Sequence, residues 1–348
     1  ALTEGIEWLR ASRPVGDILP GLYIGELGVA AALVRAGQVL SRCDLIDHAA
    51  TIMRTIAALP YTSPDIFHGT AGRLRFNLLL WQETQDPEHL AHAVRAGEFL
   101  LTQCERVGNG LARWTIPPGF EDLSGDAYLG YAHGAAGIGD ALLDLFLATG
   151  DERFLEASQS AGRWLLTKAT RRPDGGLNWP TLDAPADPPA GAFWCHGAAG
   201  IGRFFLNLAA AEVFPDAFDT ARQAARTVAA SSRRVGPTQC HGIAGSIEFL
   251  LDMHQMSCDG GFLNDARLLA RILEAFSRER DGRLVWLSDS PRLITPDYMV
   301  GYAGIAICLL RLGNPDDRPY QLSLRGFRWP SRSSSSWAAG TMNVASRH

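Results

Sequence analysis

The sequence carries six copies of a Gly-x-x-Gly turn, and this repeat constrains the fold more than any other feature. The turns begin at Gly25, Gly69, Gly134, Gly197, Gly242 and Gly301, so successive copies lie 44 to 65 residues apart. That interval is the length of a helix pair with a loop of variable size. Four copies also carry His directly before the first glycine: His68, His133, His196 and His241. The repeat therefore predicts similar units whose loops converge on one place.

The segments that follow and precede these turns differ in polarity. Those after the turns are largely apolar, as in Ile138–Ala148 and Ile201–Ala211, which indicates helices buried on most sides. The segments that alternate with them carry charge on one face: 2–12, 43–59, 87–104, 152–167, 215–231 and 263–277. This alternation predicts an all-α fold, an α/α toroid in which inner and outer rings of helices form six to seven pairs.

Glycine is expected to have a physical role at the start of each inner helix. Without a Cβ, its backbone can adopt positive φ and approach a neighbouring inner helix closely. The free N–H groups of the first helical turn would then point towards the centre of the ring. We therefore expect the functional site at this end of the inner helices.

Three longer loops share a short strand-like piece that contains a tryptophan: Trp114, Trp179 or Trp286. Their many prolines and glycines mark the remainder as irregular, so short strand-like loops are expected on one face of the toroid. We expect the toroid domain to span residues 1–318. No acidic residue follows Asp317, and the serine-rich segment 319–348 is predicted to be a C-terminal tail with little capacity to pack.

Composition excludes several classes of function. The net charge of −5 and the isoelectric point near 6.0 give no basic field for nucleic acid. The apolar runs are too short for a membrane span, and the amphipathic start does not resemble a signal peptide. The six cysteines therefore indicate thiols in a cytoplasmic protein. Four of them are interpreted as unreactive: Cys43, Cys104, Cys258 and Cys308.

The two remaining cysteines point to a metal. Cys195 and Cys240 each precede a His-Gly in equivalent repeats, and Zn²⁺ favours thiolate and imidazole ligands. Cys195, Cys240 and His241 supply three such ligands, which leaves one coordination position open for catalysis. Two alternatives remain: both cysteines are core residues, or His196 is a fourth ligand that closes a structural site.

With these motifs, the chain resembles the lanthionine synthetase cyclase (LanC-like) family from about Gly21 to Leu312. The resemblance implies that Cys195, Cys240 and His241 bind zinc. It also matches His133 to a proposed acid/base residue and Asp65 to the aspartate of an Asp-x-x-x-Gly-x-x-Gly motif.

Two positions depart from the family pattern. Gly191 stands where well-known stand-alone cyclases have Arg, and His196 stands where some members have Tyr. The chain is also shorter than those enzymes and begins without Met. It is therefore most similar to the C-terminal cyclase domain of a class IV synthetase, with linked or associated kinase and lyase domains as expected partners.

The resemblance implies a zinc-dependent lanthipeptide cyclase. Cysteine thiols of a dehydrated precursor peptide would add to dehydroalanine or dehydrobutyrine, and His133 would protonate the α-carbon. Asp65 would orient His133, accept the proton of the thiol, or simply cap a helix start. His196 is expected to line the site. His68 directly precedes the first glycine of its turn, as His133 does, but it is interpreted as a packing residue.

Three other functions fit parts of the sequence. The same zinc chemistry would serve an enzyme that adds glutathione to dehydrated residues of proteins. A toroidal glycoside hydrolase needs two carboxylates, for which Glu121, Asp122, Asp126 and Asp65 are the candidates, but it leaves Cys195, Cys240 and His241 unexplained. A non-catalytic peptide-binding toroid would use zinc only to hold the ring together.

Overall fold

The computed structural model describes residues 2–11, 18–184, 189–288 and 293–316. Within these ranges the chain forms twelve α-helices, two 3₁₀ turns (η1, Glu121–Leu123; η2, Ser232–Arg234) and three two-stranded hairpins. None of the described helices is both long and apolar enough to cross a membrane. The predicted tail, 319–348, lies outside the described residues.

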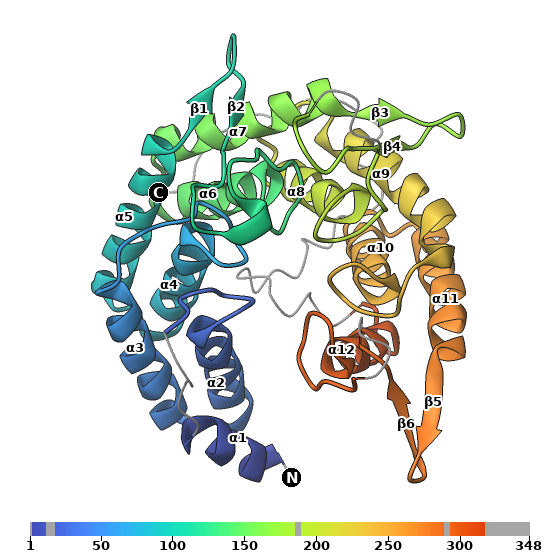
Figure 1. The fold of residues 1–348 in the computed structure, drawn as a ribbon, viewed down its shortest axis with the longest axis horizontal. Helices are drawn as coiled ribbons and strands as arrows, with labels where there is room; N and C mark the ends of the chain where they lie inside the picture. The colour runs from blue at the N-terminus through green and yellow to red at the C-terminus, as the bar shows by residue number, and fades with distance from the viewer. Residues whose placement is uncertain (1, 12–17, 185–188, 289–292, 317–348) are drawn as a thin grey trace.

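The helices form two concentric layers, which confirms the predicted all-α toroid of inner and outer helices (Figure 1). The inner layer comprises α2 (Glu26–Leu40), α4 (Thr70–Thr84), α6 (Ala135–Thr149), α8 (Ala198–Ala210), α10 (Ile243–Ser257) and α12 (Tyr302–Leu312). The outer layer comprises α3 (Cys43–Ala57), α5 (Pro87–Thr102), α7 (Glu152–Lys168), α9 (Ala217–Ser231) and α11 (Gly260–Ala275). Each outer helix packs against the inner helix that precedes it.

The two ends of the inner layer are α2 and α12, and none of the described helices lies between them (Figure 1). The N-terminal helix α1 (Leu2–Ala11) packs against α2 at one of these ends. Its Arg10 forms an ion pair with Asp44 at the start of α3. Of the predicted six to seven pairs, the described residues contain five complete pairs and the inner helix of a sixth.

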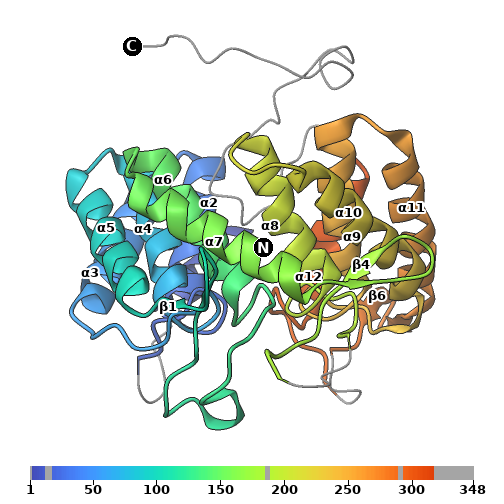
Figure 2. The ribbon, with the colours of Figure 1, turned by 90° about the horizontal axis from the view of Figure 1, so that it is seen from above.

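The strand-like pieces are short antiparallel hairpins that follow the outer helices α5, α7 and α11. They are β1–β2 (Glu105–Arg106, Ala112–Arg113), β3–β4 (Thr170–Arg171, Leu177–Asn178) and β5–β6 (Ser277–Arg280, Arg283–Trp286). The repeated tryptophans hold them in place, because each indole N–H donates to a carbonyl in the last turns of the preceding outer helix. These bonds are Trp114 to Leu100 (2.8 Å), Trp179 to Leu165 (2.8 Å) and Trp286 to Leu273 (2.9 Å). Figure 2 shows the hairpins and long loops towards the same face, as predicted.

The role of the turn glycines differs from the prediction. Only Gly25 and Gly197 of the six first glycines have positive φ, and the close approach is to the loop just before the helix. A Cβ on Gly200 would lie 1.9 Å from the carbonyl oxygen of Trp194 and 2.7 Å from Cβ of Tyr131. The second glycines thus allow each turn to fold onto its own entry loop and onto the turn of the preceding repeat.

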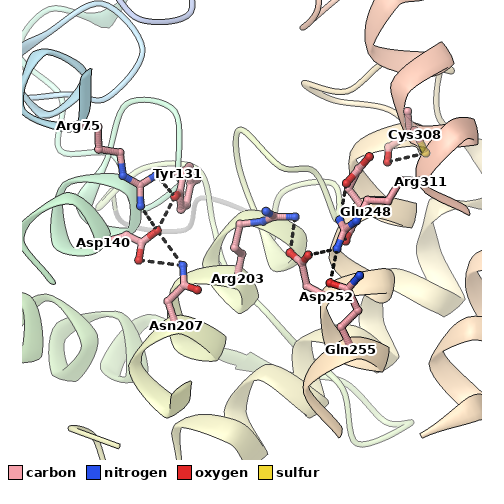
Figure 3. Close-up of polar contacts among 11 residues, drawn as sticks. Arg75, Tyr131, Asp140, Arg203, Asn207, Glu248, Asp252, Gln255, Cys308 and Arg311 are labelled. Carbon is pink, nitrogen blue, oxygen red and sulfur yellow. Dashed lines mark hydrogen bonds and ion pairs between the residues drawn. The ribbon is translucent and has the colours of Figure 1, made fainter. Parts of the chain in front are cut away.

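Buried ion pairs and hydrogen bonds join neighbouring inner helices to one another (Figure 3). Arg75 on α4 donates to Asp140 (2.6 Å) and Asp144 (2.8 Å) of α6, and Asn207 on α8 donates to the same Asp140 (2.9 Å). Burying a charge costs free energy unless the charge is paired or hydrogen-bonded. Burial alone would lower the pKa of Arg75, but the charges of Asp144 and Asp140 raise it well above its ordinary value.

A second group of charges continues this arrangement from α8 to α12. Arg203 on α8 pairs with Asp252 on α10 (2.6 Å), and Arg311 on α12 bonds both Glu248 and Asp252 (Figure 3). Arg311 also donates to Gln255 at 2.9 Å. Together the two groups connect successive inner helices from α4 to α12, so their relative rotation is fixed by polar contacts as well as by apolar packing.

Replacing Gly200 by Ala should destabilise the fold, because a Cβ there has no space beside the Trp194 carbonyl. We expect the free energy of unfolding to fall by about 3 kcal/mol, the upper range for overpacking. The matched control is Gly260→Ala, where the Cβ meets no atom within 4 Å; its stability should stay within about 1 kcal/mol of wild type. Urea unfolding followed by circular dichroism measures both, and equal effects would contradict the interpretation.

Replacing Arg311 by Leu removes the cation that faces Glu248 and Asp252. Both carboxylates are buried, since Glu248 is 1% exposed and Asp252 is 3% exposed. Since one half of a buried ion pair is then left unmatched, we expect a loss of about 3–5 kcal/mol in urea unfolding. Arg153→Leu is the control, because Arg153 pairs with Asp151 at the surface. That change should alter stability by less than about 1 kcal/mol. A loss no larger than the control's would refute the structural role of Arg311.

Candidate metal centre

A line of backbone hydrogen bonds brings the six turns together at the centre of the toroid. The residue two positions before the first glycine of a turn donates its N–H to the carbonyl of its counterpart in the next repeat. The five bonds are Tyr23 to Phe67 (3.2 Å), Phe67 to Ala132 (3.2 Å), Ala132 to Cys195 (3.1 Å), Cys195 to Cys240 (3.0 Å) and Cys240 to Met299 (2.9 Å). Because these bonds link equivalent positions, the side chains that follow in each turn lie next to one another.

Cys195, Cys240 and His241 are brought together by this arrangement. Their ligand atoms, two sulfurs and one imidazole nitrogen, all lie within 4.8 Å of one another. Both cysteines are buried and neither forms a disulfide, whereas His241 is half-buried. Cys195 and Cys240 come from the turns before α8 and α10, so a metal bound here would join two repeats.

The chemistry of these three residues fits Zn²⁺. Two thiols and an imidazole are the soft and borderline ligands that zinc prefers. Without a cation, a shared hydrogen bond with Cys195 and burial raise the pKa of the Cys240 thiol well above its ordinary value. A dication would reverse this effect, because it stabilises the bound thiolate. Among the described residues, this set has three ligands rather than four, as a catalytic zinc site requires.

A second group lies on the neighbouring turns, where Asp65, His68 and His133 have ligand-type atoms within 4.8 Å of one another. Asp65 is fully buried. Its Oδ2 lies 3.5 Å from Nδ1 of His68 and 3.6 Å from Nδ1 of His133, and it accepts a hydrogen bond from Oγ of Ser63 at 2.8 Å. Burial by itself would raise the pKa of Asp65, but the contacts with His133 and His68 hold it below its usual range. Asp65 is therefore an anion at neutral pH.

The two oxygens of Asp65 have separate roles. Oδ1 accepts the backbone N–H groups of His68 (2.6 Å) and Gly69 (3.2 Å), which caps the turn. Asp297, at the same place in the last repeat, caps its turn in the same way, with Val300 at 2.7 Å. Oδ1 thus closes the turn that precedes α4 and does not cap the helix itself, whose N-cap residue is Gly69. Oδ2 faces the imidazoles.

His196 lies between the two groups. Its ring centroid is 5.8 Å from that of His133 and 5.6 Å from that of Tyr128. Burial, and then the proximity of His133 and His241, lower the pKa of His196 to about 4, so its imidazole is neutral at pH 7. Its Nδ1 is buried and has no hydrogen-bond partner in the described part of the chain. The four turn histidines thus follow one another along the site from His68 to His241.

The structure brings together all six residues singled out from the sequence, namely Asp65, His133, Cys195, His196, Cys240 and His241. It also adds His68, which sequence reasoning assigned to packing. The signal was present, because His68 occupies the same position in its turn as His133. What the sequence did not reveal is that both imidazoles face one carboxylate.

The sequence matches a family model described as "Lanthionine synthetase C-like protein" over residues 13–324. Among solved structures, the chain is similar to nisin cyclase, with a TM-score of 0.62 and 20% identity over 88% of this chain and 80% of that one. It is also similar to a D-mannose isomerase, with a TM-score of 0.57 and 12% identity over 90% of this chain and 97% of that one. A sugar epimerase from a ruminal bacterium matches with a TM-score of 0.55 and 12% identity over 82% of this chain and 85% of that one. These structural matches show a shared fold. No curated protein matches the sequence.

Elemental analysis of the purified chain should find about one zinc per chain, the number that a single three-ligand site would bind. Cys195→Ala removes one of the three ligands and should therefore lose most of the metal. Cys308→Ala is the matched control, since its thiol is also buried but donates to the Ala244 carbonyl at 3.5 Å. A wild-type chain free of zinc, or a Cys195→Ala chain that retains it, would contradict this assignment.

Proposed function

Because this chain belongs to the lanthionine synthetase C-like family, we propose that it is a zinc-dependent cyclase that closes thioether rings in a dehydrated precursor peptide. Family membership agrees with the resemblance drawn from the Cys-His-Gly motifs at Cys195 and Cys240. The observation that carries the proposal is the convergence of two thiols and an imidazole beside a buried His–Asp pair. In this proposal the first part would activate the thiol, and the second would donate the proton that completes its addition to an activated double bond.

The reaction forms one carbon–sulfur bond and needs no redox cofactor. The thiolate of a peptide cysteine adds to the β-carbon of dehydroalanine or dehydrobutyrine, and the π electrons move to the α-carbon and its carbonyl. The α-carbon then takes up one proton, while the proton of the thiol has passed to a base or to solvent. The product is lanthionine or methyllanthionine. Linked or associated kinase and lyase domains would supply the dehydrated residues.

Cys195, Cys240 and His241 would hold the metal. When bound, zinc lowers the pKa of a coordinating substrate thiol from about 8.5, so that the thiolate is available at neutral pH. Both cysteines are buried under the turns, so that the metal would lie below the surface. Phe193, whose ring centroid lies 6.1 Å from that of His241, covers one side of the imidazole.

His133 is the proposed proton donor to the α-carbon. Its Nδ1 faces Asp65, so Nε2 is the nitrogen left to exchange a proton with the substrate. The anionic Asp65 stabilises the imidazolium and fixes the ring, which favours orientation of His133 over acceptance of the thiol proton by Asp65. His196, neutral and half-buried between His133 and His241, is proposed to contact the substrate between the thiol and the proton donor.

Two alternatives from the sequence share these residues. A glutathione-adding enzyme would use the same metal and the same His133, with a different thiol. A peptide-binding scaffold with structural zinc would not need a buried His–Asp pair next to the metal. The carboxylates proposed for a glycoside hydrolase are not equivalent, because Glu121 and Asp122 are exposed on a loop whereas Asp65 is buried and faces histidines.

Replacing His133 by Gln should keep the zinc and slow ring closure by about 10²- to 10⁴-fold, the usual range for a lost general acid. The substrate is a dehydrated peptide that contains one cysteine and one dehydroalanine. Since cyclisation does not change the mass, free thiols are counted by alkylation and mass spectrometry. Cys240→Ala should lose both zinc and ring closure.

The control for this experiment is His92→Gln, which removes an imidazole that lies 3.6 Å from Glu88 on the outer helix α5. Its activity should equal that of wild type. Unchanged ring closure in His133→Gln would refute the role of His133. Formation of a glutathione adduct, visible as added mass, without ring closure would favour the alternative enzyme.

A further inference from the structure

The site contains two imidazoles for one carboxylate. His68 and His133 stack with ring centroids 5.0 Å apart and an angle of 21° between their planes. Nδ1 of each ring faces the same oxygen, Oδ2 of Asp65, at 3.5 and 3.6 Å. The other oxygen is occupied by two backbone N–H groups of the turn. One negative charge is therefore shared by two groups that can each carry a positive charge.

We propose that His68 and His133 act as one unit that holds a single proton against Asp65, so that His68 controls how firmly His133 holds its proton. The coupling follows from the geometry alone. Its effect on catalysis rests on the function proposed above, in which His133 protonates the substrate. In this interpretation His68 is a positioning residue and does not touch the reacting atoms.

Electrostatics favours one proton over two. A carboxylate beside one imidazole stabilises the imidazolium, but a second imidazolium stacked about 5 Å away repels the first. The more exposed member is His68, whose side chain is 27% accessible against 12% for His133. His68 is therefore better placed to exchange its proton with solvent.

The described residues that contact the two rings add no other charge at neutral pH, and the carboxylates of Asp126 and Asp122 act on the outer neighbour Tyr128. Phe67 and Phe120 contact His68, and Tyr128 and His196 contact His133. Burial raises the pKa of Tyr128 above its ordinary value, and burial lowers that of His196 to about 4, so both are neutral at pH 7. Ser63 contributes only a neutral donor to Asp65. The charge balance of the unit thus depends on Asp65, His68 and His133.

The balance of charges predicts how the loss of His68 changes the proton held by His133. In His68→Gln, His133 no longer competes with a second imidazole for Oδ2 of Asp65. The positive charge that His68 can carry is also removed from the face of the His133 ring. His133 should then retain its proton to higher pH. If His133 is the proton donor, ring closure requires its protonated form, so the alkaline limb of the pH–rate profile should move to higher pH.

The direct test is an NMR titration of the histidine rings in the zinc-loaded full chain. We expect the titration midpoint of His133 to rise by at least about 0.5 pH unit in His68→Gln, the scale of a nearby like charge. The resonances of the two rings are assigned by their loss in His68→Gln and His133→Gln. The control, His92→Gln, removes an imidazole from a different carboxylate contact and should leave the His133 midpoint unchanged. An unchanged midpoint in His68→Gln would overturn the proposal.

Two further measurements separate this proposal from its alternatives. The pH–rate profile of ring closure should shift with the NMR midpoint; a rate loss at every pH without a shift would indicate a structural role for His68. If no ring closure occurs in any variant, the proposed function fails while the NMR coupling is still tested. Zinc that remains in Cys195→Ala but is lost when His68 is also replaced would show that Asp65, His68 and His133 bind metal, and would overturn the shared-proton interpretation.

Discussion

The backbone hydrogen bonds from Tyr23 through Cys195 to Met299 are the contacts on which the site depends. They link the same position of six consecutive turns, so the residue that follows that position in each repeat is presented to the same region. Because the bonds are made by the main chain, side chains as different as those of Tyr23, Ala132 and Cys195 occupy this position. One set of turns can therefore carry metal ligands, imidazoles or apolar residues.

The buried carboxylates of the described residues lie in two places, and they have different consequences. Between the inner helices, each Arg meets carboxylates directly, as in Arg75 with Asp140 and Arg311 with Glu248 (Figure 3). Such pairs fix how the helices are rotated and leave no charge free for chemistry. At the turns, Asp65 meets imidazoles, which can gain or lose a proton near neutral pH. The same principle of pairing buried charges thus serves stability between the inner helices and, in the proposed function, catalysis at the turns.

The comparisons separate the fold from its chemistry. The rings of helices are shared with a sugar epimerase and a D-mannose isomerase, at 12% identity in each case. The shared fold therefore does not by itself fix the chemistry. In the proposed function, the residues that precede the turn glycines carry the chemistry and the helices supply a stable frame for them.

The sequence by itself determined the repeat, the alternation of apolar and amphipathic helices, and the convergence of Cys195, Cys240 and His241. These follow from periodicity, since equivalent positions in stacked units are neighbours. Only the tertiary structure decided that Arg75 meets Asp140, or that His68 and His133 share Asp65. Such contacts depend on how each helix is rotated and how each turn bends, which residue spacing does not specify.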